Sequence, residues 1–174
     1  MKATKQTGIR GPSFLYKIVK PEIKALPDSP GDVLAVVSTE VKDRDGDIIR
    51  QAYWDLKSFL EHPILLSSHN YSDIRAQIGE WKEMSVKGRK LIGVAHYYVG
   101  EGNDEADWAF NLASKGRAAF SVGFIPDMDK AKVIDGDGDD DEMDGFFFRR
   151  PMEFMGQTLL EVSHVTVPAN PEAL

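Results

Sequence analysis

The chain contains no cysteine in its 174 residues. Disulfide bonds, thiolate metal ligands and cysteine nucleophiles are therefore excluded. No apolar run approaches the roughly 18 residues that a membrane span requires, and the basic N-terminal stretch has no apolar segment of the kind found in secretory signals. The net charge of −7 argues against general affinity for nucleic acid. We therefore expect neither a membrane nor a nucleic acid as partner.

Length and composition predict one globular domain. The chain is 42% hydrophobic and 28% charged, which is ordinary for such a domain. We expect residues 14–174 to form this domain and residues 1–13 to be a flexible lead-in. An acidic loop at about 127–145 contains the run "DGDGDDDEMDG", which holds much of the negative charge. Such a run is typical of a solvated, mobile loop.

Short apolar and alternating runs predict many strands and two helices. The expected helices cover 51–63 ("QAYWDLKSFLEHP") and 104–116 ("DEADWAFNLASKG"), where apolar residues recur at helical spacing. The expected strands cover 13–20, 32–40, 118–126 and 158–168, with a further strand that passes into a loop within 63–70 ("PILLSSHN") and a hairpin formed by 76–85 and 90–99. This pattern indicates a β-rich α+β domain, in which the strands could close into a barrel.

The strand "AAFSVGFIP" carries a hydroxyl, that of Ser121, among apolar side chains. A buried hydroxyl without a partner costs about 1–3 kcal/mol. Ser121 is therefore either an ordinary strand serine with a structural partner or a residue with a chemical role. The nearby Gly123 would let a substrate backbone approach closely.

A serine nucleophile needs a base to take its proton, and the base is usually histidine. His62 stands at a predicted helix end and His96 lies within a predicted hairpin strand, so we expect structural roles for both. His69 closes "PILLSSHN", where a strand passes into a loop and a side chain can face a cleft. His164 lies in the last predicted strand.

The last strand, "TLLEVSHVTV", also contains a carboxylate, that of Glu161. A carboxylate in a core strand is costly unless it is paired, and a histidine base needs such a group to orient it. Alternatively, Glu161 and Ser163 lie on a solvent-exposed face of the strand. Val165 and Val167 share that alternation and weaken this interpretation.

Two segments are rich in aspartate and glycine, as calcium loops are. They are "DRDGD" (Asp43 to Asp47) and the acidic run. Neither matches an EF-hand. In the acidic run, counted from Asp135, Asp140 and Phe146 stand where that loop needs Gly and Glu. A tight turn and a solvated loop are the favoured interpretations, and we predict no metal and no cofactor.

Four segments, taken together and in order, resemble one protein family. "LLSSHN", "AAFSVGF" and "LLEVSHVTVPANPEA" present His, Ser and an acid in sequence, and "DRDGDIIRQAYWD" precedes them. They resemble the motifs of the tailed-phage prohead (procapsid maturation) proteases, serine endopeptidases related to herpesvirus assemblin. The resemblance runs from about Val36 to Ala173.

The resemblance implies the assemblin-like fold, a closed β-barrel with surrounding helices. It implies Ser121 as the nucleophile, His69 as the general base and Glu161 as the carboxylate that orients His69. Assemblin uses a second histidine as its third member, so His164 is a rival for the role of Glu161.

The resemblance also implies partners and a place of action. The substrate would be scaffolding protein or the scaffolding segment of the major capsid protein, and the chain would process itself and could self-associate. This would happen inside the immature capsid, in the cytoplasm of an infected bacterium. Two other classes stay open: a non-catalytic capsid or tail assembly protein of the same fold, and a calcium-binding module that uses the acidic loops.

Overall fold

The computed structural model describes residues 24–26, 29–134 and 150–174. The predicted lead-in, the predicted strand at 13–20 and the acidic run at 135–145 lie outside the described residues. Within the described part, no helix has the length and apolar character needed to cross a membrane.

The elements follow one another in an order dominated by strands. They are β1 (Lys24–Ala25), β2 (Asp32–Thr39), β3 (Ile48–Ile49), the 3-10 helix η1 (Gln51–Tyr53), β4 (Trp54–Asp55), α1 (Lys57–Glu61), β5 (Ile64–Ser67), the 3-10 helix η2 (Ile74–Ala76), β6 (Gln77–Lys87), β7 (Lys90–Tyr97), α2 (Asp104–Ala113), β8 (Ala119–Pro126), β9 (Lys132–Val133), β10 (Met152–Phe154) and β11 (Gln157–Val165).

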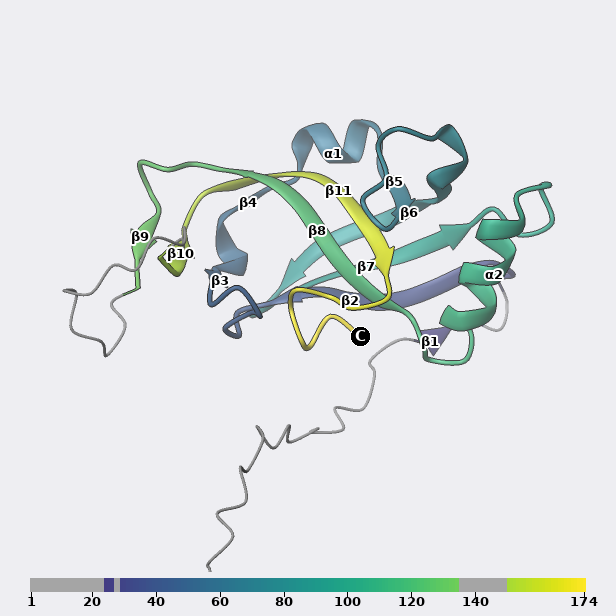
Figure 1. The fold of residues 1–174 in the computed structure, drawn as a ribbon, viewed down its shortest axis with the longest axis horizontal. Helices are drawn as coiled ribbons and strands as arrows, with labels where there is room; N and C mark the ends of the chain where they lie inside the picture. The colour runs from purple at the N-terminus through teal and green to yellow at the C-terminus, as the bar shows by residue number, and fades with distance from the viewer. Residues whose placement is uncertain (1–23, 27–28, 135–149) are drawn as a thin grey trace, which may run out of the picture.

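Most strands belong to one sheet of eight, in the order β1-β2-β7-β6-β5-β11-β4, with β8 paired to β11. A smaller sheet has the order β3-β10-β9. In Figure 1 the green β8 and the yellow β11 run side by side and cross over β2 and β7. The large sheet therefore bends back over itself, and its inner surface forms the core. The protein is a mostly β, α+β domain, as predicted.

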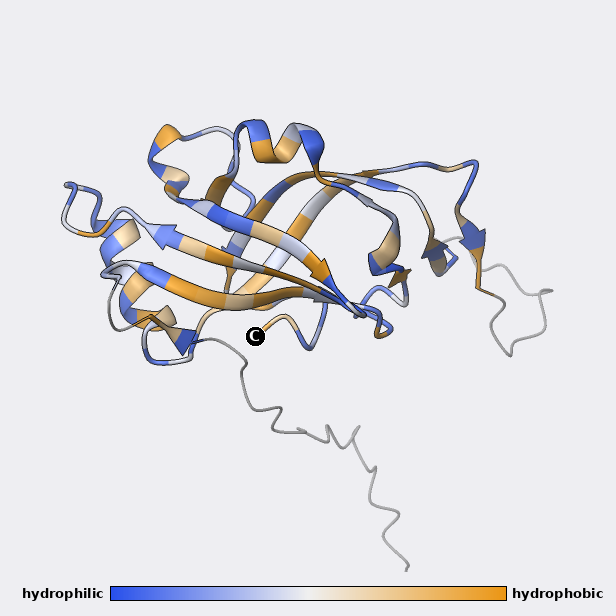
Figure 2. Ribbon diagram, turned by 180° about the vertical axis from the view of Figure 1, so that it is seen from behind, coloured by the Kyte–Doolittle hydropathy of each residue, from blue (hydrophilic) through white to orange (hydrophobic). Residues whose placement is uncertain are grey.

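Large apolar side chains from both limbs of the bent sheet meet in this core. The ring centroids of Trp81 on β6 and Phe120 on β8 are 5.3 Å apart in an edge-to-face contact. Tyr97 on β7 is fully buried and contacts Phe110 of α2. Burial alternates along β7, and hydrophobic segments lie along the long strands in Figure 2. Burial of this apolar surface is the main force that holds the two limbs together.

The hairpin and the second helix agree with the sequence patterns that predicted them. β6 and β7 are joined by a tight turn in which Gly88 has φ +62°, a backbone conformation that glycine adopts readily. Helix α2 begins after Asn103, whose side chain accepts the N–H of Glu105 at 3.2 Å. It ends at Ala113, three residues before the predicted end at Gly116.

The helix predicted over 51–63 is wrong as a single element. Only α1 is α-helical, and Trp54–Asp55 instead forms β4, which pairs in parallel with Gln157–Thr158 of β11. The indole N–H of Trp54 on β4 donates to the side chain of Gln51 in η1 at 2.9 Å, and this bond links the two elements before α1. The pairing with β11, a contact that is distant in sequence, outweighs the local helical periodicity.

The predicted closed barrel is also wrong. Among the described strands no ladder joins β2 to β8, so the sheet stays open along that line. The segment after β11 lies there instead. The backbone N–H of Phe120 donates to the Ala173 carbonyl at 3.0 Å, and the Asn170 side chain donates to the Thr39 carbonyl at 2.9 Å. This irregular segment takes hydrogen bonds that a closing ladder would need, and in Figure 1 the yellow trace after β11 turns back along β2.

Candidate active site

Three adjacent strands bring the predicted site residues together. β11 lies between β5, which is parallel to it, and β8, which is antiparallel. His69 follows the end of β5, Ser121 lies on β8 and Glu161 lies on β11. Residues separated by 92 positions in the chain, His69 and Glu161, consequently come into direct contact.

The imidazole of His69 is hydrogen-bonded to the carboxylate of Glu161. His69 Nδ1 and Glu161 Oε1 are 2.6 Å apart, with side-chain exposures of 37% and 1%. A carboxylate only accepts, so Nδ1 carries the proton and Nε2 is left free as a base. The hydrogen bond to Glu161 raises the pKa of His69 above its ordinary value. This is the arrangement that holds a histidine base in its working tautomer.

The loop that carries His69 has an unusual backbone. Ser68 has φ +51° and His69 has φ +54°, in the left-handed region that residues other than glycine rarely adopt. Backbone donors fix this conformation: Ser68 N–H donates to the His164 carbonyl at 3.0 Å, and His69 N–H donates to Ser163 Oγ at 3.0 Å. The imidazole is therefore attached to a stretch of backbone that two hydrogen bonds hold in place.

A β-bulge places Glu161 on the face that carries the site. The register of β11 against β8 shifts between Leu159 and Glu161, so the strand has one extra residue there. Such bulges re-aim side chains. As a result Leu159 and Val162 face the core, while the Glu161 carboxylate faces His69.

The exposed face suggested for this part of β11 is wrong. Glu161 is 1% exposed and Ser163 is 0% exposed. Each oxygen of the Glu161 carboxylate accepts at least one hydrogen bond from a side chain. Oε2 accepts from Ser163 Oγ at 2.6 Å, and Oε1 accepts from His69 and, at 3.2 Å, from Tyr71 Oη. These three donors offset the cost of burying the charge.

Gly123 has a different role from the predicted one. It stands opposite Glu161 in the β8–β11 ladder. A Cβ at this position would collide with Glu161 Oε1 and would lie 2.9 Å from Tyr71 Oη. The space beside this glycine is therefore occupied by the carboxylate and is not open to a substrate backbone.

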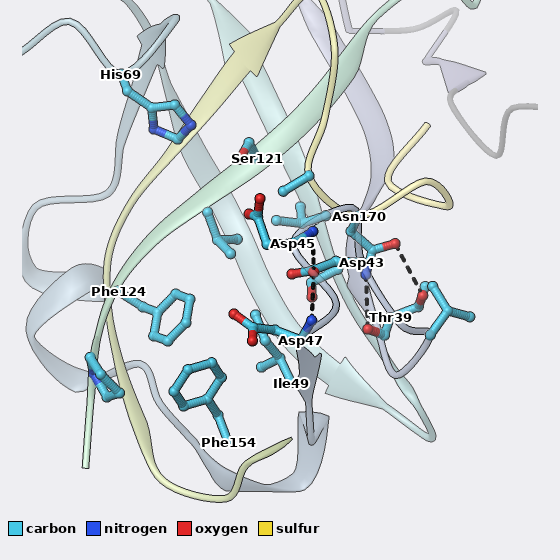
Figure 3. Close-up of a pocket in the computed structure, with 16 residues that line it drawn as sticks. Thr39, Asp43, Asp45, Asp47, Ile49, His69, Ser121, Phe124, Phe154 and Asn170 are labelled. Atoms are coloured by element: carbon cyan, nitrogen blue, oxygen red, sulfur yellow. Dashed lines mark hydrogen bonds between the residues drawn. The ribbon is translucent and has the colours of Figure 1, made fainter. Parts of the chain in front are cut away.

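Ser121 is half-buried and lies opposite Ser163 in the same ladder. Its hydroxyl makes no hydrogen bond to any residue within the described ranges. Ser121 and His69 line one cavity of about 490 Å³. In Figure 3 the His69 ring extends toward the side of this cavity on which Ser121 lies. Among the described residues, therefore, no hydrogen-bond partner gives the Ser121 hydroxyl a purely structural role.

The rest of the cavity wall is apolar at one end and acidic at the other. Phe124 and Phe154 form the apolar end, and the "DRDGD" turn supplies the carboxylates. The remaining lining residues are Val37, Ser38, Thr39, Val41, Ile49, Val122, Pro126, Ala169 and Asn170. The last two come from the segment that fills the gap between β2 and β8, so that segment also shapes the cavity.

The "DRDGD" segment is a tight turn, as predicted. Asp43 Oδ1 accepts the backbone N–H groups of Asp45 at 2.9 Å and Asp47 at 2.8 Å. Asp47 in turn accepts the N–H of Met152 at 2.7 Å. Among the residues that the structure describes, no group of three or more acidic or histidine side chains is arranged to hold a metal ion. The second aspartate-rich segment lies outside the described residues.

His164, the rival third member, points into the core and not toward His69. Its Nδ1 is 3.2 Å from Tyr97 Oη, and its ring contacts Phe120 with centroids 5.8 Å apart. Burial lowers the pKa of His164 to about 4. A neutral core imidazole on the opposite face of β11 is not placed to orient His69.

His96 has its own partner, as predicted. Its Nδ1 is 2.6 Å from Asp32 Oδ1, and Lys82 Nζ is 2.9 Å from the same oxygen. These three side chains tie together β7, β2 and β6 on a part of the sheet away from Ser121. His62 is exposed at the end of α1.

Two site residues were missed or misjudged at the level of sequence. Tyr71 follows His69 by two positions, and its hydroxyl contacts Glu161. Ser163 follows Glu161 by two positions, so strand alternation could have placed both on one face. The alternation with Val165 and Val167 was the one local signal that this face is buried.

The assembled groups are the Ser121 hydroxyl and the Nε2 of His69, neither of which has a hydrogen-bond partner within the described ranges, and the buried carboxylate of Glu161, which is bonded to Nδ1 of the same imidazole. Together they are suited to nucleophilic acyl transfer. Comparisons with family models, curated proteins and solved structures found no match to this chain. Its function is therefore inferred from the residues and their geometry.

Proposed function

We propose that the protein is a serine endopeptidase with Ser121 as nucleophile, His69 as general base and Glu161 as the acid that orients the base. The observation that carries this proposal is the 2.6 Å hydrogen bond between His69 and Glu161, on the wall of the cavity that Ser121 also lines. The Ser121 hydroxyl has no hydrogen-bond partner among the described residues, and it lines the same cavity as the imidazole of this pair.

The reaction would follow the established chemistry of serine peptidases. Ser121 Oγ attacks the carbonyl carbon of the substrate peptide bond while His69 Nε2 takes its proton. The Glu161 carboxylate stabilises the imidazolium that results. His69 then gives the proton to the departing amine, which leaves an ester on Ser121. Water, deprotonated by His69, hydrolyses this ester and restores the serine.

We further propose that the enzyme acts in phage capsid maturation. The support is the resemblance of the His, Ser and acid segments to the prohead proteases, together with the convergence of two of these segments in a hydrogen-bonded pair. On this proposal the fold is a variant of the assemblin-like fold that stays open between β2 and β8. The substrates are scaffolding protein or the scaffolding segment of the major capsid protein, and the chain itself, inside the immature capsid.

The test uses purified protein in two parallel assays. Wild type is incubated with the capsid or scaffolding protein encoded beside it, and separately with a fluorophosphonate probe that labels activated serines. Wild type should cleave and should be labelled at Ser121, whereas Ser121→Ala should do neither. Ser72→Ala removes an exposed hydroxyl near the base loop and serves as the matched control.

Two outcomes would contradict the proposal. Cleavage or labelling that survives Ser121→Ala would remove Ser121 from the role of nucleophile. A wild-type protein that neither cleaves nor reacts with the probe would favour the non-catalytic assembly protein.

A further inference from the structure

Ser163 makes two hydrogen bonds that join the base to the acid. Its Oγ accepts the backbone N–H of His69 at 3.0 Å and donates to Glu161 Oε2 at 2.6 Å. The residue is 0% exposed, so its hydroxyl is shielded from water. One hydroxyl thus contacts the backbone of the base and the side chain of the acid at once.

We propose that Ser163 is a positioning residue, which holds the imidazole of His69 and the carboxylate of Glu161 in register with each other. This inference rests on the proposed function, because it concerns the geometry of the same reaction. Ser163 touches neither substrate nor the reacting atoms, and it acts only through the two residues that it connects.

The donors and acceptors around the Ser163 hydroxyl support this role. A serine hydroxyl has one proton to donate, and here it goes to the carboxylate, which can only accept. The hydroxyl oxygen is then an acceptor for the His69 N–H. Replacing Ser163 by alanine would remove the partner of the His69 N–H and of the buried Glu161 Oε2, and nothing else within the described ranges bonds to either atom.

The backbone of the base loop makes the first of these bonds important. His69 has φ +54° and follows a residue with φ +51°. Residues other than glycine hold this conformation only where the surroundings enforce it. The bond from His69 N–H to Ser163 is one of the contacts that enforce it, so its loss would let the loop relax and carry the imidazole away from Ser121.

The position of Ser163 in the sheet adds a third connection. Ser163 is the ladder partner of Ser121, across from it in the antiparallel pair of β11 and β8. The residue that holds the base and the acid is therefore set in register with the candidate nucleophile by the sheet itself. A small displacement of catalytic groups is costly, since a shift of about 1 Å can reduce the rate about 100-fold.

Tyr71 offers an internal comparison. It also donates to Glu161, but at 3.2 Å, and the residue is 70% exposed. Water can replace its hydroxyl, and the residue makes no described bond to the backbone of His69. Tyr71→Phe should therefore disturb the site less than Ser163→Ala does.

The experiment compares Ser163→Ala with Ser163→Thr, which keeps the hydroxyl, and with Thr158→Ala, a half-buried hydroxyl at the far end of β11. The first readout is the cleavage rate: kcat should fall about 100-fold in Ser163→Ala, with KM little changed. The second readout is the NMR signal of the His69 ring. In Ser163→Ala the low-field Nδ1 proton should weaken by faster exchange, and the ring should titrate at a lower pH than in wild type.

Ser163→Thr should restore both readouts, and Thr158→Ala should change neither. If the larger threonine prevents folding, as judged by circular dichroism, Ser163→Cys supplies a weaker donor of similar size and should give intermediate values. A folded Ser163→Ala protein whose His69 titration and Nδ1 proton match wild type would overturn the inference.

The NMR readout separates this inference from the proposed function. It requires no substrate and no catalysis, so it tests Ser163 even if wild type cleaves nothing. Conversely, an active wild type together with an unperturbed Ser163→Ala would remove only the positioning role and leave the endopeptidase proposal intact.

Discussion

Gly123 and Glu161 are ladder partners on β8 and β11, and the missing side chain of Gly123 provides the space that the Glu161 carboxylate occupies. The carboxylate lies over the β8 backbone and reaches His69 at 2.6 Å. One glycine on the strand of the candidate nucleophile thus permits the acid on the neighbouring strand to meet the base.

Gly123→Ala should displace the Glu161 carboxylate and lower the cleavage rate while the protein stays folded. The added methyl group would collide with Glu161 Oε1 and would lie 2.9 Å from Tyr71 Oη. We expect kcat to fall by about 100-fold, the usual consequence of misplacing a catalytic group by about 1 Å. Gly88→Ala is the matched control, since it strains a turn with φ +62° but has nothing within 4 Å. Equal activity in both variants would contradict this role for Gly123.

Glu161→Gln should nearly abolish turnover while the fold persists. An amide has nearly the same shape, but it can donate to Nδ1 and so favour the wrong tautomer of His69. In serine peptidases the corresponding change lowers kcat by about 10⁴-fold. Steady-state cleavage rates measure the effect, with the exposed Glu83→Gln as control.

The same assay separates the two candidates for the third member. His164→Gln alters a core residue that contacts Tyr97 and not His69, so at a temperature where both variants are folded it should retain far more activity than Glu161→Gln. If His164→Gln instead loses more activity than Glu161→Gln, His164 and not Glu161 is the third member of the site.

The pH dependence of cleavage should report the pKa of His69. The base works only when it is neutral, and the hydrogen bond to Glu161 raises the pKa of His69 above 6.5. Cleavage, measured as kcat/KM, should therefore rise with pH through a midpoint above that of an ordinary histidine. Removing the carboxylate charge in Glu161→Gln should move the midpoint of the residual activity to lower pH. An acidic limb with its midpoint below 6 in wild type would contradict the pairing.

Stability should fall in acid because of His164. Burial lowers the pKa of His164 from the usual 6.5 to about 4, so the unfolded chain takes up a proton in this window that the folded protein does not. The free energy of unfolding should decrease as pH falls from 6.5 to 4, by about 3 kcal/mol from this residue. Denaturant titrations at a series of pH values measure it.

The variant His164→Gln should flatten this acid dependence, and His62→Gln, at an exposed position, should leave it unchanged. His69 acts in the opposite sense and in another window, because its raised pKa contributes stability that is lost only as pH rises above about 6.5. A wild-type protein with constant stability between pH 6.5 and 4 would show that His164 is not buried as a neutral group.

Much of the secondary structure was predictable because its causes are local. Alternating apolar residues predicted β2, β8 and β11, and a glycine between two such runs predicted the β6–β7 hairpin. Acidic residues before an apolar stripe predicted α2. The chemistry of the site was also accessible in part, because a hydroxyl, an imidazole and a carboxylate stood out as unusual in otherwise apolar strands.

The errors arose where a distant partner decides the local conformation. The helical spacing over 51–63 is real, but pairing with β11 draws Trp54–Asp55 into a strand. Many short strands commonly close into a barrel, but here the C-terminal segment bonds to Phe120 and Thr39 in the place of a closing ladder. Neither partner can be read from the periodicity of the segment that it alters.

The sequence by itself determined a β-rich domain, one without cysteine chemistry, and it singled out Ser121, His69 and Glu161 as the residues that needed explaining. Only the tertiary structure decided that a bulge in β11 buries Glu161 and that a left-handed loop held by Ser163 brings His69 to it. It also decided that Gly123 leaves the space that the Glu161 carboxylate occupies. The physical reason is that hydrophobic periodicity reports which face of a strand is buried. It does not report which strand lies beside it, and the pairing of strands is what brings the base and the acid together.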